Sequence, residues 1–245
     1  MVDRIVIIPT YNEIENIELI IDKVFSLSVE FHILVVDDGS PDGTAAVVKR
    51  LQQSRYAGRL FLEERKGKLG LGTAYIHGFR WALARQYEYI CEMDADFSHN
   101  PEDLVRLYET ASTTADMVIG SRYITGVNVV NWPMSRVLMS YFASAYVRWI
   151  MRISIRDATA GFVCFKREVL ETINLDKVKF VGYAFQIEMK FKALEAGFMV
   201  EEIPIIFTDR TRGESKMSTK IFREAFWGVI QLKWESIFRK KKKWA

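Results

Sequence analysis

Apolar runs of strand length alternate with segments of helical periodicity over the first half of the chain. The expected strands cover residues 5–8, 33–36, 60–62 and 89–93, and the expected helices cover residues 14–24, 44–51, 72–84 and 104–111. This alternation is typical of a parallel sheet covered by helices. The first two strands are uniformly apolar, which indicates that both of their faces are buried. The pattern therefore predicts an α/β fold with a mostly parallel sheet.

The second half of the chain has longer amphipathic segments. Helices are expected at residues 133–153 and 184–196, strands at 161–165 and 199–207, and a last helical stretch at 221–238 that precedes the basic run from Arg239 to Lys243. A chain of 245 residues, 49% of them hydrophobic, is long enough for one substantial core. We expect one structural unit, with a main domain over residues 1–216 and an amphipathic, basic tail over residues 217–245.

Two carboxylates in one short turn give the strongest chemical signal. Asp94 and Asp96 follow the strand expected at residues 89–93, and the carboxyl ends of parallel strands form the ligand-binding edge of such sheets. Mg²⁺ typically takes one or two carboxylates together with substrate phosphates. An alternative is that one Asp caps the next helix, but Asn100 and Pro101 offer a cap and a first helical residue. The spacing favours a site for Mg²⁺ or Mn²⁺.

Two further turns offer groups for a nucleotide. Asp37 and Asp38 end the second strand, where a carboxylate can accept hydrogen bonds from a ribose or a base edge. The alternative, a solvated Asp/Gly turn, suits Asp42 and Gly43 better. Residues 65–72 are basic and glycine-rich before a helix, an arrangement that can bind phosphate or can simply be a flexible loop. Their spacing is neither GxGxxG nor a P-loop, which disfavours a dehydrogenase or a P-loop NTPase.

Charge and cysteine usage limit the partners and the compartment. A formal charge of +3 gives no indication of nucleic-acid binding. Cys91 and Cys164 lie in apolar runs without CxxC spacing, so we expect buried, reduced thiols and a cytoplasmic location. The N-terminus lacks the pattern of a signal peptide. The longest apolar run, residues 137–147, is far shorter than the roughly 20 residues that cross a bilayer, so any membrane contact should be peripheral.

The ordered motifs resemble those of the family 2 glycosyltransferases with the Rossmann-like GT-A fold. The resemblance is closest to polyprenyl-phosphate (dolichyl-phosphate) mannosyltransferases and extends from about residue 5 to residue 216. The motifs are PTYNE at 9–13, DDGSPDGT at 37–44, GLG at 70–72, DADFSH at 94–99, GSRY at 120–123, DATAGF at 157–162, GYAFQIE at 182–188 and RTRGESK at 210–216.

The resemblance implies GDP-mannose as donor, a polyprenyl phosphate as acceptor and Mg²⁺ or Mn²⁺ as cofactor. It implies that Asp94 and Asp96 serve the metal and the diphosphate and that Arg210 contacts the donor phosphates. The implied nucleotide-sugar residues are Pro9, Tyr11, Glu13, Asp37, Asp38 and Lys216, and the implied acceptor-phosphate residues are Arg122, Arg136 and Ser140. Members often have Gln where this chain has Ser98, which leaves that contact unassigned.

The implied reaction needs no catalytic histidine. A phosphate monoester is already anionic near neutral pH, so it can attack the sugar without a general base. None of His32, His77 and His99 has an obvious partner in the sequence. A single displacement would invert the anomeric configuration, and a metal together with Arg210 would stabilise the departing diphosphate.

The polyprenyl acceptor implies contact with a membrane surface, on its cytoplasmic face. Residues 221–238, the basic run after them and the aromatic residues within 133–153 are the candidates for that contact. The alternative is that the last helix packs on the core or on a second copy of the chain. Other readings are a glucosyltransferase that uses UDP-glucose, a family 2 enzyme with a soluble acceptor, and a sugar-nucleotide sensor without catalysis.

Overall fold

The computed structural model describes residues 2–209 and 226–237 and builds them around one large sheet. The sheet has seven strands in the order β3-β2-β1-β4-β7-β5-β8, and only β7 runs antiparallel to its neighbours. The strands are β1 (Arg4–Thr10), β2 (His32–Asp37), β3 (Leu60–Glu64), β4 (Tyr89–Glu92), β5 (Met117–Ser121), β7 (Val163–Lys166) and β8 (Val200–Pro204). The predicted α/β fold with a mostly parallel sheet is confirmed.

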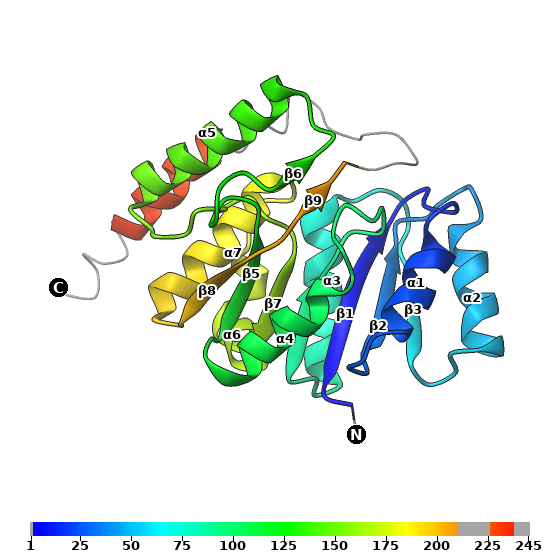
Figure 1. The fold of residues 1–245 in the computed structure, drawn as a ribbon. Helices are drawn as coiled ribbons and strands as arrows, with labels where there is room; N and C mark the ends of the chain where they lie inside the picture. The colour runs from blue at the N-terminus through cyan, green and yellow to red at the C-terminus, as the bar shows by residue number, and fades with distance from the viewer. Residues whose placement is uncertain (1, 210–225, 238–245) are drawn as a thin grey trace.

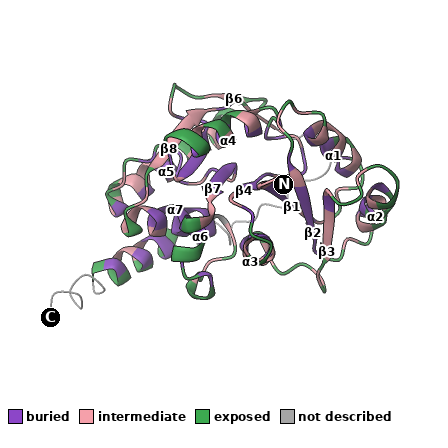
Figure 2. Cartoon of the chain, turned by 90° about the horizontal axis from the view of Figure 1, so that it is seen from below, coloured by how far each residue is buried: buried purple, intermediate pink, exposed green. Residues whose placement is uncertain are grey.

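Helices cover both faces of this sheet, as Figure 1 shows. They are α1 (Ile17–Phe25), α2 (Thr44–Ser54), α3 (Leu71–Ala84), α4 (Asp103–Thr113), α5 (Met134–Met151), α6 (Arg167–Thr172) and α7 (Tyr183–Ala196). In β1, Ile5 and Ile7 pack with α3, α6 and α7, whereas Val6 and Ile8 pack with α1, α2 and α4. Both faces are buried, as the uniformly apolar strands predicted, and Figure 2 draws most of β1 and its neighbours as buried.

The region between residues 116 and 209 departs from the predicted elements in several places. The sequence interpretation did not predict β5, α6 or the short strand at residues 129–130. The single strand expected at residues 199–207 is two strands, because the chain leaves β8 after Pro204 and pairs again as β9 (Phe207–Thr208) with β6 (Val129–Val130). This switch carries the chain from the main sheet to a two-stranded parallel ribbon close to the start of α5.

The helical residues 226–237 lie beside α5 (Figure 1). Val229 and Leu232 are buried in a cluster with Val147 of α5 and Phe191 of α7. Packing of this helix on the core, one of the two alternatives, is therefore confirmed for this face. Among the described residues, no helix combines the length and the apolarity needed to cross a membrane. Arg210, Lys216 and the run Arg239–Lys243 lie outside the described residues.

Candidate active site

The loops that follow β1 and β2 are bonded to each other at the carboxyl edge of the sheet. The backbone N–H of Asn12 donates to Ser40 Oγ at 2.9 Å, and that of Glu13 donates to Thr44 Oγ1 at 3.0 Å. Asn12 adopts φ = +56°, a left-handed conformation that Asn tolerates better than most residues. These bonds bring the predicted residues Pro9, Tyr11 and Glu13 next to the turn after β2.

Asp37 is buried where β1 and β2 end side by side. It pairs in register with Thr10, whose hydroxyl donates to Asp37 Oδ1 at 2.8 Å. Ser40 donates its backbone N–H to Oδ2 at 2.8 Å and its hydroxyl to Oδ1 at 2.6 Å. These three bonds fix the carboxylate, and the predicted nucleoside contact of Asp37 stays a prediction.

Asp38 fastens the basic loop of residues 65–72. Arg65 Nε donates to Asp38 Oδ1 at 2.6 Å, and the Leu69 backbone N–H donates to Oδ2 at 3.3 Å. The loop is therefore tied to the end of β2, and it brings the Lys68 ammonium 5.1 Å from the centroid of the Tyr11 ring. The side chain of Asp38 thus holds this loop, and its predicted nucleotide contact stays a prediction.

The turn with Asp94 and Asp96 follows β4 and is held by its own backbone. Asp96 Oδ1 accepts the Ser98 backbone N–H at 3.0 Å, and Phe97 takes φ = +61°. The Asp94 backbone N–H points to His99 Nδ1 at 3.3 Å, and the Tyr75 hydroxyl lies 3.5 Å from Asp94 Oδ1. One short turn thus carries both carboxylates at the carboxyl edge of the sheet.

His99 supports this turn, a role that the sequence interpretation missed. Burial lowers the pKa of His99 to about 4, so the imidazole is neutral and Nδ1 can accept the Asp94 N–H. Its ring stacks on Phe162 at 4.8 Å. His32 and His77 also have side-chain partners, Tyr87 and Glu63 respectively. The partners of His32 and His77 come from other elements of the fold, which is why the sequence did not reveal them.

The expected cap of the next helix also differs from the structure. Asn100 Oδ1 accepts the Glu102 backbone N–H at 3.2 Å, and α4 begins only at Asp103. Asn100 and Pro101 thus form a turn before the helix, while Asp96 bonds within its own turn.

The described residues contain no group of three or more His, Cys, Asp or Glu side chains that could hold a metal ion. Two carboxylates suit a cation whose shell is completed by phosphate and water.

Arg122 is buried in a fork-shaped ion pair with Asp157. Its Nε donates to Asp157 Oδ2 at 2.7 Å and its Nη2 to Oδ1 at 2.6 Å. Its backbone N–H also donates to Asp157 Oδ2, and Nη2 reaches Thr159 Oγ1 at 2.9 Å. Burial opposes ionisation of Asp157, but attraction to Arg122 and these hydrogen bonds keep the pKa of the carboxyl below its usual value. Arg122 is thus a buried and rigidly placed cation.

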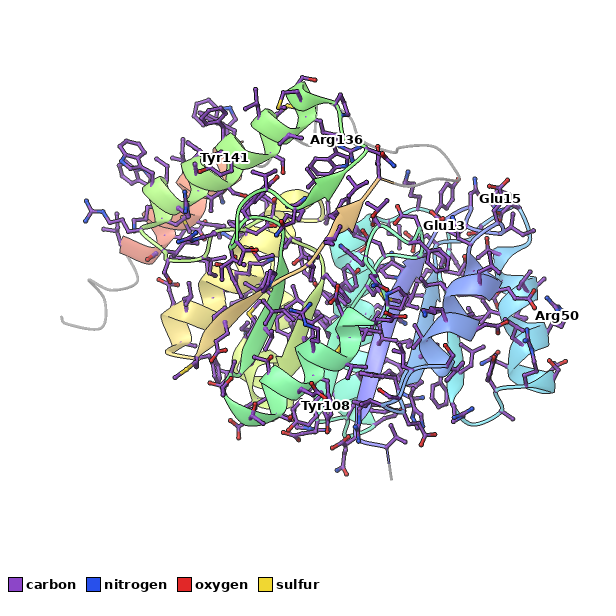
Figure 3. All side chains as sticks on the ribbon, viewed as in Figure 1. Glu13, Glu15, Arg50, Tyr108, Arg136 and Tyr141 are labelled. Carbon is purple, nitrogen blue, oxygen red and sulfur yellow. The ribbon has the colours of Figure 1, made fainter. Side chains whose placement is uncertain are left out.

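Arg136 lies close to Arg122 at the first turn of α5. The Arg136 guanidinium is 4.2 Å from the centroid of the Trp132 ring, and the Arg122 guanidinium is 5.6 Å from the same ring. Arg136 Nη1 also donates to both carboxylate oxygens of Asp209 at 2.9 and 3.0 Å. In Figure 3, Arg136 and Glu13 both lie toward the upper edge of the sheet. Ser140, one turn after Arg136, lies near the Tyr123 hydroxyl.

Phe207 of β9 lies between the Asp94–Asp96 turn and the arginines, and no motif in the sequence pointed to it. Its ring centroid is 5.4 Å from that of His99 and 5.2 Å from that of Trp132, and the Arg122 guanidinium lies 5.5 Å from it. The next N–H, of Thr208, donates to the Ser98 carbonyl at 3.2 Å. The predicted metal turn and the predicted acceptor arginines are therefore neighbours in one site.

Comparisons with known proteins agree with this arrangement. The sequence profile described as Glycosyl transferase family 2 matches residues 5–173, and the chain belongs to that family. Its relatives include the "Polyprenol monophosphomannose synthase" of Mycolicibacterium smegmatis, 48% identical over 93% of this chain and 85% of that protein. The "Undecaprenyl-phosphate mannosyltransferase" of Micrococcus luteus is 43% identical over 94% of this chain and 96% of that protein. The resemblance to polyprenyl-phosphate mannosyltransferases is thereby confirmed.

Solved structures with low sequence identity share the fold. A mannosyltransferase from Pyrobaculum calidifontis, in complex with GDP-mannose and Mn²⁺, matches with a TM-score of 0.61 at 21% identity, over 97% of this chain and 64% of that one. The glucosyl-3-phosphoglycerate synthase of Mycobacterium tuberculosis, with Mn²⁺ and UDP-glucose, gives a TM-score of 0.68 at 18% identity, over 94% of this chain and 79% of that one. These likenesses confirm the predicted GT-A fold.

Proposed function

We propose that this chain is an enzyme that transfers mannose from GDP-mannose to a polyprenyl phosphate and inverts the anomeric configuration. The observation that carries the proposal is the 48% and 43% identity, over nearly the whole chain, to two proteins named for mannose and a polyprenyl phosphate. GDP-mannose as the donor follows from the resemblance of the motifs. The strand-end carboxylates and the nearby arginines supply the groups that this reaction requires.

Asp94 and Asp96 are the proposed holders of a divalent cation, Mg²⁺ or Mn²⁺. The fit rests on the donor set, two carboxylates from one rigid turn, because Mg²⁺ keeps waters and substrate phosphates in the rest of its shell. When bound, the cation would neutralise the negative charge that develops on the departing diphosphate. The loops around Asp37 and Glu13 lie at the same edge and would hold the nucleoside.

The acceptor phosphate would bind where the two guanidinium groups converge on Trp132. Arg122 is fixed there by Asp157, and Arg136 projects from the first turn of α5. Arginine recognises phosphate through several N–H groups held in one plane. The phosphate is anionic near neutral pH, since its second pKa is about 6. It therefore attacks the anomeric carbon directly, and His99, which is neutral and supports the metal turn, removes no proton.

The lipid chain of the acceptor would enter a membrane beneath α5. Large apolar side chains of α5 and of the helix at residues 226–237 are exposed: Met134, Leu138, Met139, Phe142, Trp149, Phe226, Trp227, Trp234 and Ile237. An exposed apolar patch of this kind marks a contact with a membrane or a protein. The helix at 226–237 packs on the core through Val229 and Leu232, and its exposed aromatic residues are the ones that we propose for the membrane contact.

A radiochemical assay tests the proposed function. Purified protein should produce a lipid-extractable mannosyl product from GDP-[¹⁴C]mannose and a short polyprenyl phosphate, and a chelator should abolish this product. UDP-[¹⁴C]glucose in the same assay should give none. Transfer from UDP-glucose alone, transfer only to water-soluble glycans, or binding of GDP-mannose without turnover would contradict the proposal. These three outcomes would identify, respectively, a glucosyltransferase, an enzyme with a soluble acceptor and a sensor.

A further inference from the structure

Three polar side chains lie buried beneath the Asp94–Asp96 turn, and the reaction as described above does not use them. Glu92 is the last residue of β4, and Gln186 and Lys190 lie on α7. Glu92 and Lys190 are completely buried, and Gln186 is 2% exposed. Placing a carboxyl group and an amine in an apolar layer costs stability unless both are hydrogen-bonded. The presence of Glu92, Gln186 and Lys190 in the core therefore indicates that they have a role beyond packing.

Gln186 bridges the two ionisable side chains. Its Nε2 donates to Glu92 Oε2 at 2.7 Å, and its Oε1 accepts from Lys190 Nζ at 3.0 Å. Lys190 Nζ also donates to the Ala160 carbonyl at 2.6 Å and to the Gln186 carbonyl at 3.3 Å. Three acceptors match the three hydrogens of an ammonium group. Burial lowers the pKa of Lys190, whereas the three acceptors favour the charged ammonium form.

The two ends of this bridge reach the two halves of the site. Glu92 precedes Asp94 by two residues on the same chain segment. At the other end, the Ala160 carbonyl that Lys190 binds belongs to the segment of residues 157–162. That segment also carries Asp157, which fixes Arg122. A buried cation on α7 therefore fastens the loop from which the proposed acceptor arginine takes its orientation.

We propose that Lys190 is a positioning residue for the acceptor phosphate, which it places by holding the 157–162 segment so that Asp157 can orient Arg122. Gln186 and Glu92 keep the Lys190 side chain directed at the Ala160 carbonyl. Glu92 Oε1 is buried without a hydrogen-bond partner among the described residues, so the arrangement carries a cost in stability that packing alone does not explain. The inference rests on the proposed function, because Arg122 is taken to serve the acceptor.

The test is the Lys190→Met variant, which keeps an unbranched side chain of similar length and removes the charge and its hydrogen bonds. The KM for polyprenyl phosphate should rise about tenfold, the size expected for the loss of one hydrogen bond to a charged group. The KM for GDP-mannose should change by less than about twofold, because the loops after β1 and β2 do not touch Lys190. Circular dichroism checks that the variant is folded.

Lys192→Met is the matched control, with the same substitution two residues later on α7. Lys192 binds the Lys177 carbonyl at 2.9 Å and pairs with Glu188, outside the segment of residues 157–162. The Lys192→Met variant should have the same KM as the wild type for polyprenyl phosphate and for GDP-mannose. If Lys190 serves only the core, Lys190→Met should lower the amount of active protein and leave both KM values unchanged, and that result would overturn the inference.

A second variant decides the question if Lys190→Met does not fold. Gln186→Leu removes the bridge to Glu92 and leaves the bond from Lys190 to Ala160 available. It should raise the KM for polyprenyl phosphate more than that for GDP-mannose, because Glu92 also adjoins the Asp94–Asp96 turn; equal changes in both, or none, would overturn the inference. Wild-type protein that fails to transfer mannose would overturn the proposed function itself, and the inference with it.

Discussion

Individual charged residues of the candidate site are held by partners that lie far away in the sequence. Asp94 and Asp96 could be predicted because both lie in one turn directly after an apolar strand. The partner of Arg122 could not be predicted, since Asp157 is 35 residues away and meets it only through the fold. The same holds for Asp38, which the sequence pattern assigned to the nucleotide and which the structure pairs with Arg65. The spacing of residues in the sequence shows which side chains could bind a ligand. The tertiary contacts decide which of them bind the ligand and which position other side chains.

Replacement of Arg122 by Lys should destabilise the protein far more than replacement of Arg136. Arg122→Lys cannot reproduce the fork that binds both oxygens of the fully buried Asp157, and breaking a buried pair costs about 3 kcal/mol of unfolding free energy. Arg136→Lys affects a partly exposed pair, in which only Nη1 contacts Asp209, and should cost less than about 1 kcal/mol. Urea unfolding of both variants measures the difference. Equal losses of unfolding free energy in the two variants would mean that the Arg122–Asp157 pair contributes no more than a surface ion pair.

At the scale of elements, the sequence predicted the strands and helices whose hydrophobic residues recur with a clear periodicity. The uniformly apolar β1 and β2 and the helical repeats of α1 to α4 lie close to the expected residues. β5 was missed because Met117–Ser121 is a short run with a glycine and a serine at its end. β8 and β9 were merged because the apolar run of residues 203–207 continues across the break between them, and only pairing with β6 shows where the chain changes sheets. Periodicity detects an element but not its partner.

The exposed face of α5 should bind lipid. Phe142 and Trp149 are 62% and 78% exposed, although side chains of this kind are usually buried. Full burial of one such side chain yields about 1.5–3 kcal/mol, so half-insertion of both should contribute about 2 kcal/mol. The double variant Phe142→Ser and Trp149→Ser should therefore lower co-sedimentation with anionic liposomes at least tenfold.

Leu19→Ser supplies the control for this measurement. Leu19 is an exposed apolar residue of α1, which lies on the opposite side of the molecule from α5 (Figures 1 and 2). Its loss should leave liposome binding unchanged. Equal binding by the double variant and the wild type would assign the exposed face of α5 to a second copy of the chain or to another protein.

Deletion of residues 238–245, which lie outside the described residues, should also weaken binding to liposomes, because it removes the basic run.

At the scale of the whole molecule, one sheet edge brings together groups for the nucleoside, the metal and the acceptor. β1, β2 and β4 end there, and Phe207 of β9 and Asp209 just after it lie between the metal turn and α5. The helix at residues 226–237 packs on α5 and α7. The boundary expected at residue 216 stays a prediction. The sequence motifs predicted which segments carry the site, but their relative placement needed the complete fold.

Donor binding should stabilise the protein only when a divalent cation is present. A ligand at a concentration 100 times its Kd adds about 2.7 kcal/mol, which raises the Tm of a domain of this size by about 5 to 10 °C. GDP-mannose with MnCl₂ should therefore give a clear thermal shift, and a chelator or Asp94→Asn should remove most of it. Asp176→Asn, a change of the same kind on the exposed 3₁₀ turn Leu175–Lys177, should keep the full shift. A shift that persists with chelator would mean that GDP-mannose binds through the loops after β1 and β2 alone, and that the carboxylates of Asp94 and Asp96 hold no metal against the diphosphate.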